Sequence, residues 1–282
     1  MYAPIWMLGA LISFSFMAVG ARELSGELST FQILFFRSLI GLVIVSAVIL
    51  GLRDHGLFAS SRKGLHGFRN LFHFAGQYGW FLGLGLLPLA EVFALEFTMP
   101  IWVVIIASLF LNEALSIKKI VAIVLGMAGV LLIVRPGIEI IDAASFIVLA
   151  AALFYAVSHT VTKSLSSTDK PLTIVFYMCL IQLPIAWILA LPGWIWPNNI
   201  EWLWLTIVGL TALTAHFCMT KAMQHAEVGT VVVLDFFRLP LIAIVGVMVY
   251  GETFDIALIA GGALMLLGNM INHYRTPTEV KS

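Results

Sequence analysis

Three ionisable residues stand inside long apolar runs of this sequence. Glu96 lies four positions before Pro100, and Asp235 and Arg238 lie three positions apart, just before Pro240. A spacing of three places two side chains on one face of an α-helix. Asp235 and Arg238 therefore either neutralise each other or offer a cation and a proton carrier to a ligand. One charge at the centre of a membrane helix costs about 2.5–3.5 kcal/mol on insertion scales, so these residues need partners or a wet cavity.

Glu96 has no basic partner on its own apolar run. It either faces a cavity or forms a buried salt bridge with Arg37 or Arg238. If the segments that carry Glu96 and Asp235 meet, their two carboxylates can face one cavity and form a proton-coupling site.

Further polar side chains occur at helical spacing inside apolar runs. One stripe has spacings of three and four and comprises Asn70, His73, Gln77 and Trp80. Tyr155 and His159 are four apart in another run, and His216 stands in a third. Such side chains either line a transport path or form hydrogen bonds between packed helices. Five aromatic residues could also stack on a flat or cationic substrate: Phe14, Tyr78, Trp80, Trp102 and Tyr155.

The composition explains why these groups must be positioned by membrane helices. The 282 residues are 61% hydrophobic and only 11% charged, whereas soluble domains carry about 25% charged residues. The formal net charge is zero, which gives no signal for nucleic acid. Cys179 and Cys218 lie in apolar runs and are expected to be core residues, and no metal site or cofactor is predicted. The chain is predicted to be an all-α integral membrane protein.

Apolar segments of about 20 residues are long enough to cross the hydrocarbon. By this rule we expect ten spans, at 4–22, 31–51, 67–87, 91–111, 117–134, 143–163, 171–191, 202–221, 228–250 and 256–273. The first is interpreted as a span and not a signal peptide, because Arg22 and Glu23 follow it where small residues would be expected.

The basic residues predict the orientation. With a cytoplasmic N-terminus, eleven of the fifteen Lys and Arg residues fall on the cytoplasmic side: Arg53, Arg62, Lys63, Arg69, Lys118, Lys119, Lys163, Lys170, Lys221, Arg275 and Lys281. Such a bias orients membrane proteins, so both termini are expected in the cytoplasm.

The two halves of the chain repeat each other. When Glu113 is aligned with Glu252, Glu96 falls on Asp235, and Gly129 on Gly268. We therefore expect a first repeat at 1–137, a second at 138–275 and a cytoplasmic tail at 276–282. Five spans per repeat invert the second repeat relative to the first, as in carriers that bind substrate near the midplane.

Several residues are assigned structural roles in this architecture. The two prolines are expected to kink their spans, the glycines to allow close helix packing, and each of the two glutamates at span ends to satisfy the N-terminus of the helix that follows it. The structural residues are Arg37, Pro100, Pro240, Glu113, Glu252, Gly129 and Gly268.

The motifs resemble those of the EamA family of the drug/metabolite transporter superfamily. In the first half they are Leu87-Pro88-Leu89-Ala90-Glu91, Phe97-Thr98-Met99-Pro100, Asn112-Glu113 and the segment from Gly126 to Pro136. In the second half they are Leu234-Asp235-Phe236-Phe237-Arg238-Leu239-Pro240 and Gly251-Glu252, and Phe35-Phe36-Arg37 adds a further match. The resemblance is to the branch that includes riboflavin and S-adenosylmethionine transporters. Glu96 departs from the small polar residue, such as serine, expected there.

The resemblance implies a ten-helix carrier of small organic molecules in the inner membrane, with both termini cytoplasmic. We expect a secondary transporter that works by alternating access, with protons as a candidate coupling ion. The expected substrate and translocation residues are Glu96, Asp235, Arg238, His73, Gln77, Trp80, Tyr155, His159 and His216. The alternatives are a gradient-independent facilitator and a membrane enzyme that uses Glu96 and Asp235. No Walker A loop, HExxH or GxSxG motif supports an enzyme.

Overall fold

A computed structural model describes residues 2–87, 89–113, 115–134, 143–251 and 256–273. Over these residues the elements are α-helices and one short 3-10 helix. Their bounds are α1 Ala3–Leu24, α2 Thr30–Leu52, η1 His55–Phe58, α3 Lys63–Leu86, α4 Leu89–Glu96, α5 Met99–Phe110, α6 Ile117–Val134, α7 Ala143–Leu165, α8 Pro171–Ala190, α9 Asn199–His225, α10 Val228–Asp235, α11 Arg238–Tyr250 and α12 Ile256–His273.

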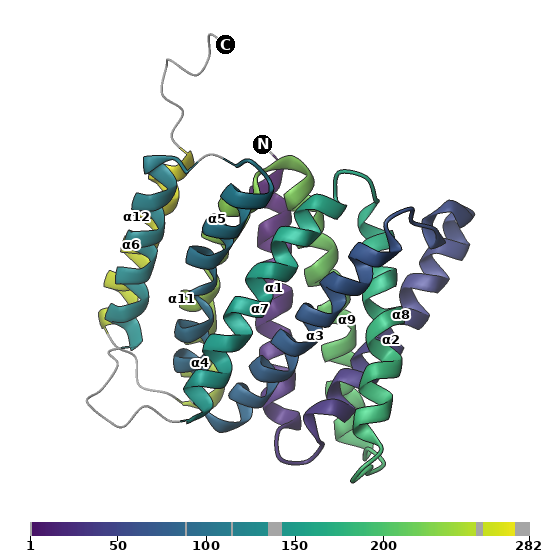
Figure 1. Cartoon of the computed structure of the whole chain (residues 1–282). Helices are drawn as coiled ribbons and strands as arrows, with labels where there is room; N and C mark the ends of the chain where they lie inside the picture. The colour runs from purple at the N-terminus through teal and green to yellow at the C-terminus, as the bar shows by residue number, and fades with distance from the viewer. Residues whose placement is uncertain (1, 88, 114, 135–142, 252–255, 274–282) are drawn as a thin grey trace.

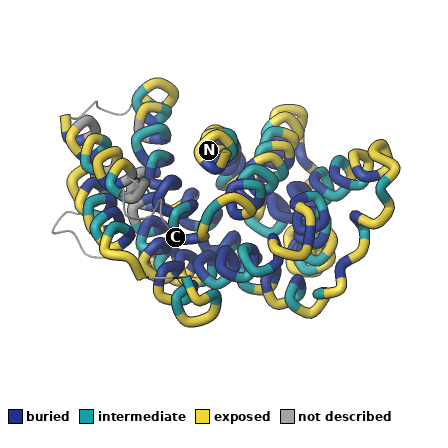
Figure 2. The backbone as a smooth tube through the Cα atoms, turned by 90° about the horizontal axis from the view of Figure 1, so that it is seen from above, coloured by how far each residue is buried: buried dark blue, intermediate teal, exposed yellow. Residues whose placement is uncertain are grey.

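Six segments of the described chain are long and apolar enough to cross a membrane. They are Ala3–Leu24, Thr30–Leu52, Ala143–Leu165, Pro171–Ala190, Asn199–His225 and Val228–Tyr250. Seen from above, the buried residues face the space between the helices and many exposed residues lie on the rim (Figure 2). Large apolar side chains are among the exposed ones, for example Met248 and Phe110. The prediction of an all-helical membrane protein is confirmed.

Local signals explain where several helices begin and end. Asn198 and Glu201 form a capping box at the start of α9, because each side chain accepts a hydrogen bond from the backbone of the other residue. Proline is in the first turn of α1, α5 and α8, where its missing N–H costs nothing. α11 is followed by Gly251, whose φ of 65° suits glycine at the end of a helix.

The helices pack as four long pairs. α1 lies along α9, α3 along α7, α2 along α8 and α6 along α12 (Figure 1). Glycines allow close approach between some of these helices. A Cβ on Gly268 of α12 would lie 3.0 Å from the carbonyl oxygen of Ala122 on α6. Gly129 of α6 is also buried.

Two expected spans are interrupted. The segment 91–111 is divided into α4 and α5 at Phe97–Thr98, and the segment 228–250 into α10 and α11 at Phe236–Phe237. The breaks lie just before Pro100 and Pro240, which stand in the first turns of α5 and α11. The rings of Phe97 and Phe236 are 5.2 Å apart. The two breaks therefore face each other, with Glu96, Asp235 and Arg238 at their edges.

Two basic side chains have matching positions near helix ends. Arg22, at the end of α1, donates from Nη1 to the carbonyl oxygens of Leu84 and Leu87 at 3.2 and 3.0 Å. Lys163, near the end of α7, donates from Nζ to those of Met223 and Ala226 at 2.6 and 2.7 Å. Each cation thus caps the C-terminus of another helix, α3 and α9 respectively, where the helix dipole favours positive charge.

Glu113 contacts the start of a helix that is distant in the sequence. Its carboxylate accepts from the backbone N–H groups of Val228 and Gly229, at 2.9 and 3.4 Å, at the start of α10. It also pairs with Lys119 at 3.5 Å. Contacts between distant helices determine this partner, which sequence spacing does not reveal. Glu252 lies outside the described residues.

Candidate functional site

A cavity between the two broken helices gathers side chains from distant parts of the sequence. Its free volume, as space open to the centre of a water molecule, is about 20 Å³, which is room for one or two waters. The side chains come from α1, α3, α4, α7, α9, α10 and α11. They are Phe14, Met17, Gln77, Trp80, Glu96, Tyr155, His159, His216, Met219, Asp235 and Arg238. In this conformation the cavity is closed tightly around its polar groups.

Arg238 is the centre of a buried ion cluster. Its Nη2 donates to Glu96 Oε1 at 2.6 Å and to Asp235 Oδ2 at 2.7 Å. Trp80 donates from Nε1 to the second oxygen of Glu96 at 2.7 Å. The three ionisable side chains are at most 5% exposed, so solvent does not screen them. Two carboxylates against one guanidinium give the cluster a formal charge of −1 when all three are ionised.

Aromatic rings surround the guanidinium of Arg238. Its carbon Cζ lies 4.9, 5.2 and 5.5 Å from the ring centroids of Phe14, Phe93 and Phe97. Ring faces attract a cation at these distances and exclude water from it. The charge of Arg238 is therefore already compensated by two carboxylates and three rings.

The alternatives for these charges turn out to be compatible. Asp235 and Arg238 pair with each other, and both still line the cavity. Glu96 lines the cavity and also forms the salt bridge with Arg238. Arg37 is not the partner of Glu96, because its guanidinium donates to Gln77.

All of the expected cavity residues line the cavity except His73. His73 lies one layer farther out. Its ring centroid is 4.7 Å from that of His216 and 5.7 Å from that of Tyr155. His73 therefore contacts the lining and is itself fully buried behind it.

Sequence reasoning missed two lining residues, Met17 and Met219. Each lies three positions after another lining residue, Phe14 on α1 and His216 on α9. Helical spacing could have found them, since residues three apart share a face. Methionine side chains are flexible and can adapt to ligands of different shape.

A second polar cluster adjoins the cavity and is centred on Arg37 of α2. Arg37 Nη1 donates to Gln77 Oε1 at 3.1 Å and to Gln182 Oε1 at 3.2 Å. Gln182 Nε2 lies 3.1 Å from Asn70 Oδ1 and 2.8 Å from His73 Nδ1. The polar stripe of α3 is thus part of one network with α2 and α8. Gln182, on α8, is the member that the sequence did not single out.

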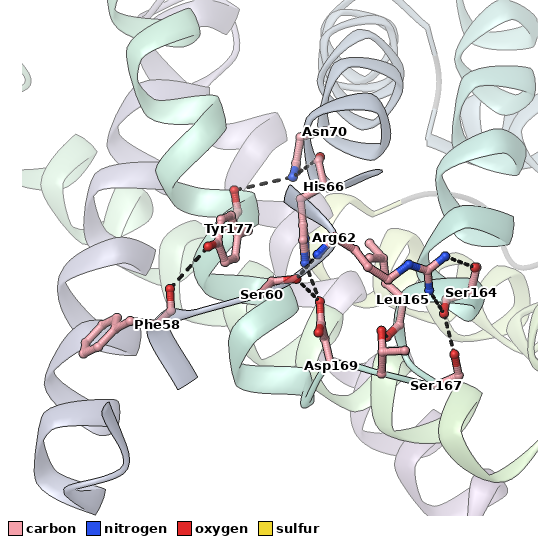
Figure 3. Close-up of polar contacts among 11 residues, drawn as sticks. Phe58, Ser60, Arg62, His66, Asn70, Ser164, Leu165, Ser167, Asp169 and Tyr177 are labelled. Atoms are coloured by element: carbon pink, nitrogen blue, oxygen red, sulfur yellow. Dashed lines mark hydrogen bonds and ion pairs between the residues drawn. The ribbon is translucent and has the colours of Figure 1, made fainter. Parts of the chain in front are cut away.

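The same network continues to the N-terminus of α3 (Figure 3). Asn70 Nδ2 donates to the carbonyl oxygen of His66 at 2.8 Å. His66 Nε2 lies 2.7 Å from Asp169 Oδ2, and Ser60 Oγ donates to the same oxygen at 2.6 Å. Asp169 lies in the link between α7 and α8. This cluster therefore ties the start of α3 to a segment about a hundred residues away.

In the part of the chain that the structure describes, no group of three or more His, Cys, Asp or Glu side chains is arranged to hold a metal ion. The cavity instead presents one ion cluster, hydrogen-bonding groups and aromatic faces. These are groups that bind and orient a small molecule.

Comparison with known proteins shows the family of the chain. The sequence profile described as the EamA-like transporter family matches residues 1–135 and 143–273. The chain belongs to the EamA-like transporter family. It is 28% identical to a riboflavin transporter of Vibrio cholerae serotype O1, over 93% of this chain and 90% of that protein. It is 22% identical to an S-adenosylmethionine uptake transporter of Rickettsia prowazekii, over 98% and 94% of the two chains.

Other relatives extend the range of named substrates. A pseudopaline exporter of Pseudomonas aeruginosa is 27% identical, over 93% of each chain. A solved crystal structure superposes with a TM-score of 0.81 over 99% of each chain at 19% identity, which shows the fold. This EamA-like protein is therefore a metabolite transporter of the drug/metabolite type and a multi-pass protein of the inner membrane. It is a transporter rather than an enzyme.

Proposed function

We propose that this EamA-like protein is a secondary carrier that moves a small organic metabolite by alternating access of the central cavity. The observation that carries the proposal is the ion cluster of Glu96, Asp235 and Arg238, held between two helix breaks that face each other. Broken helices place charged groups at a binding site and allow each half-helix to move. The small free volume supports a closed intermediate, from which substrate is admitted when the helices separate.

Inverted repeats are part of the proposal and are supported by the packing. If α1–α6 and α7–α12 are equivalent, α1 corresponds to α7 and α3 to α9. The pair α1–α9 then corresponds to α7–α3, and both pairs are present. Arg22 and Lys163 cap corresponding helices in the same manner. The family profile also matches each half separately.

The expected ten spans are retained if α4 with α5 and α10 with α11 each count as one interrupted span. α1 begins and α12 ends at the same end of the bundle (Figure 1). Together with the distribution of Lys and Arg along the sequence, this favours cytoplasmic termini.

Proton coupling follows from the charge of the cluster. One cation faces two carboxylates, so a proton on Glu96 or Asp235 makes the buried cluster neutral. A neutral ion cluster crosses between inward- and outward-open states at lower cost than a charged one. The carrier is therefore expected to take up a proton with, or in exchange for, its substrate.

The substrate class rests on the lining and on the relatives. Trp80, Tyr155, His159 and His216 offer flat faces and polar atoms, which suit a conjugated or heterocyclic metabolite. The names of the relatives include riboflavin, S-adenosylmethionine and pseudopaline. Since these differ in chemistry and direction of transport, the substrate is proposed only as a small organic metabolite.

Uptake into proteoliposomes tests the proposal. Wild type is offered a mixed metabolite pool with and without an inward proton gradient, and solutes are identified by mass spectrometry. Glu96→Gln and Asp235→Asn are run beside it, with Glu23→Gln, an acid near the end of α1, as control. Proton coupling is supported if a solute accumulates in the wild type only with the gradient, and if this dependence is lost in Glu96→Gln or Asp235→Asn but kept in Glu23→Gln. Gradient-independent equilibration in all variants indicates a facilitator. No movement of any solute contradicts the carrier.

A further inference from the structure

Two buried arginines of the polar network that adjoins the cavity have no acidic partner among the described residues. Arg37 and Arg69 are 2% and 3% exposed. Arg37 donates to two glutamine oxygens and Arg69 donates to Thr162 and Asn70. Neutral acceptors satisfy some N–H groups but leave the two positive charges in place. We propose that the Arg37 cluster, defined as Arg37, Arg69, His73, Gln77 and Gln182, binds the anionic group, a carboxylate or phosphate, of the transported metabolite.

The direction of each hydrogen bond follows from Arg37. A guanidinium can only donate, so Gln77 and Gln182 must turn their amide oxygens towards it. The amide nitrogen of Gln182 then donates to His73 Nδ1 at 2.8 Å. In a neutral imidazole this places the proton on His73 Nε2. The cluster is therefore an ordered set of donors.

Two of these donors have no acceptor. His73 Nε2 and Arg37 Nε are buried and lack a hydrogen-bond partner within the described residues. Buried donors without acceptors are rare, because each loses its hydrogen bonds to water. A water molecule would satisfy a donor but leave both charges uncompensated. An anion does both, and an oxyanion supplies several acceptor sites at once.

The Arg37 cluster also touches the cavity. Gln77 belongs to the Arg37 cluster and also lines the cavity. Its amide oxygen accepts from Arg37, so its amide nitrogen is the group that can donate to a ligand. The His73 ring packs against His216 and Tyr155, which line the cavity. Across the cavity, the ion cluster of Arg238 carries a formal charge of −1. The two clusters therefore suit a metabolite with two different groups. Its anionic group would bind at the Arg37 cluster, and a cationic or proton-donating group would face Glu96 and Asp235. This inference rests on the proposed carrier function.

Thermal unfolding of the full-length protein in detergent tests the site without transport. Acetate and inorganic phosphate replace bulky gluconate at constant ionic strength. In wild type, at least one of the two anions should raise Tm in a saturable manner, by about 2–4 °C. Arg37→Gln should abolish the rise. In gluconate alone, Arg37→Gln should melt at or above the wild-type Tm, because it removes an uncompensated charge.

Arg22→Gln is the matched control. It removes an arginine that donates to the backbone carbonyl oxygens of Leu84 and Leu87 and does not line the cavity, so it should lower Tm in gluconate and keep the anion-dependent rise. The proposal is overturned if neither anion raises the Tm of the wild type in a saturable manner. It is also overturned if Arg37→Gln keeps the anion-dependent rise in Tm. A lower Tm of Arg37→Gln in gluconate also overturns it, since that outcome makes Arg37 a structural hydrogen-bond donor. Uptake of an uncharged metabolite that is unaffected by Arg37→Gln would leave the carrier function standing and reject the anion site alone.

Discussion

Glu96 and Arg238 are joined by a 2.6 Å ion pair although 142 positions separate them in the chain. Glu96 ends α4 and Arg238 begins α11, so the pair joins the first broken helix to the second. Asp235 shares the same nitrogen of Arg238 at 2.7 Å. Removal of an acid and removal of the arginine therefore leave different net charges in the cluster. Loss of one acid leaves a neutral pair, whereas loss of the arginine leaves two neighbouring carboxylates without a cation.

We predict that Arg238→Gln destabilises the protein far more than Glu96→Gln. Removing one partner from a buried ion pair costs about 3–5 kcal/mol. Glu96→Gln should cost less, because its amide oxygen can still accept from Trp80 and Arg238 still faces Asp235. Thermal unfolding in detergent measures both. The double variant Glu96→Gln/Arg238→Gln should recover part of the stability lost in Arg238→Gln, and equal losses for the two single variants would contradict this account.

Arg22 and Lys163 yield a prediction about the repeats. Arg22→Met and Lys163→Met each remove two charge-assisted hydrogen bonds to carbonyls at a helix C-terminus. Each should lower stability by about 1–3 kcal/mol, measured by thermal unfolding. Lys170→Met is the control, because the exposed pair of Lys170 with Asp54 should contribute at most about 1 kcal/mol. A large loss for only one of the two capping residues would argue against equivalent roles.

The sequence predicted this site better than it predicted the partners within it. Glu96, Asp235 and Arg238 were found because they are ionisable residues inside apolar runs. Such residues are rare in membrane helices, since burying a charge there costs free energy unless it is paired or functional. Spacing cannot show which helices touch. The capping of α10 by Glu113 and the role of Gln182 depend on contacts between distant helices. The helix breaks were expected only as kinks, because proline marks an interruption without showing its extent.

Gly126 tests the packing around the second helix break. A Cβ at this position would lie 2.5 Å from the ring of Phe236, closer than real atoms approach. Gly126→Ala should therefore cost about 1–3 kcal/mol through overpacking, despite the better helix propensity of alanine. Gly262→Ala is a matched control on α12, where the nearest atom to a Cβ is Pro240 Cβ at 3.7 Å. Thermal unfolding of the two variants should differ in sign or differ clearly in size. A neutral Gly126→Ala would show that the Phe236 ring can move aside.

Asp169 is expected to hold one end of the bundle closed. Its Oδ2 accepts from Ser60 and lies 2.7 Å from His66 Nε2, and these residues are largely shielded from solvent. Asp169→Asn should lose the charge-assisted bonds and speed hydrogen exchange of the backbone at 55–66, by about tenfold or more for a loss of 1.4 kcal/mol or more. Ser167→Ala, in the same link, removes only an exposed local bond to Ser164 and should leave exchange unchanged. The opposite end of the bundle, at 195–205, should exchange at the wild-type rate in both variants. Equal acceleration at both ends would indicate general destabilisation and contradict a local closing contact.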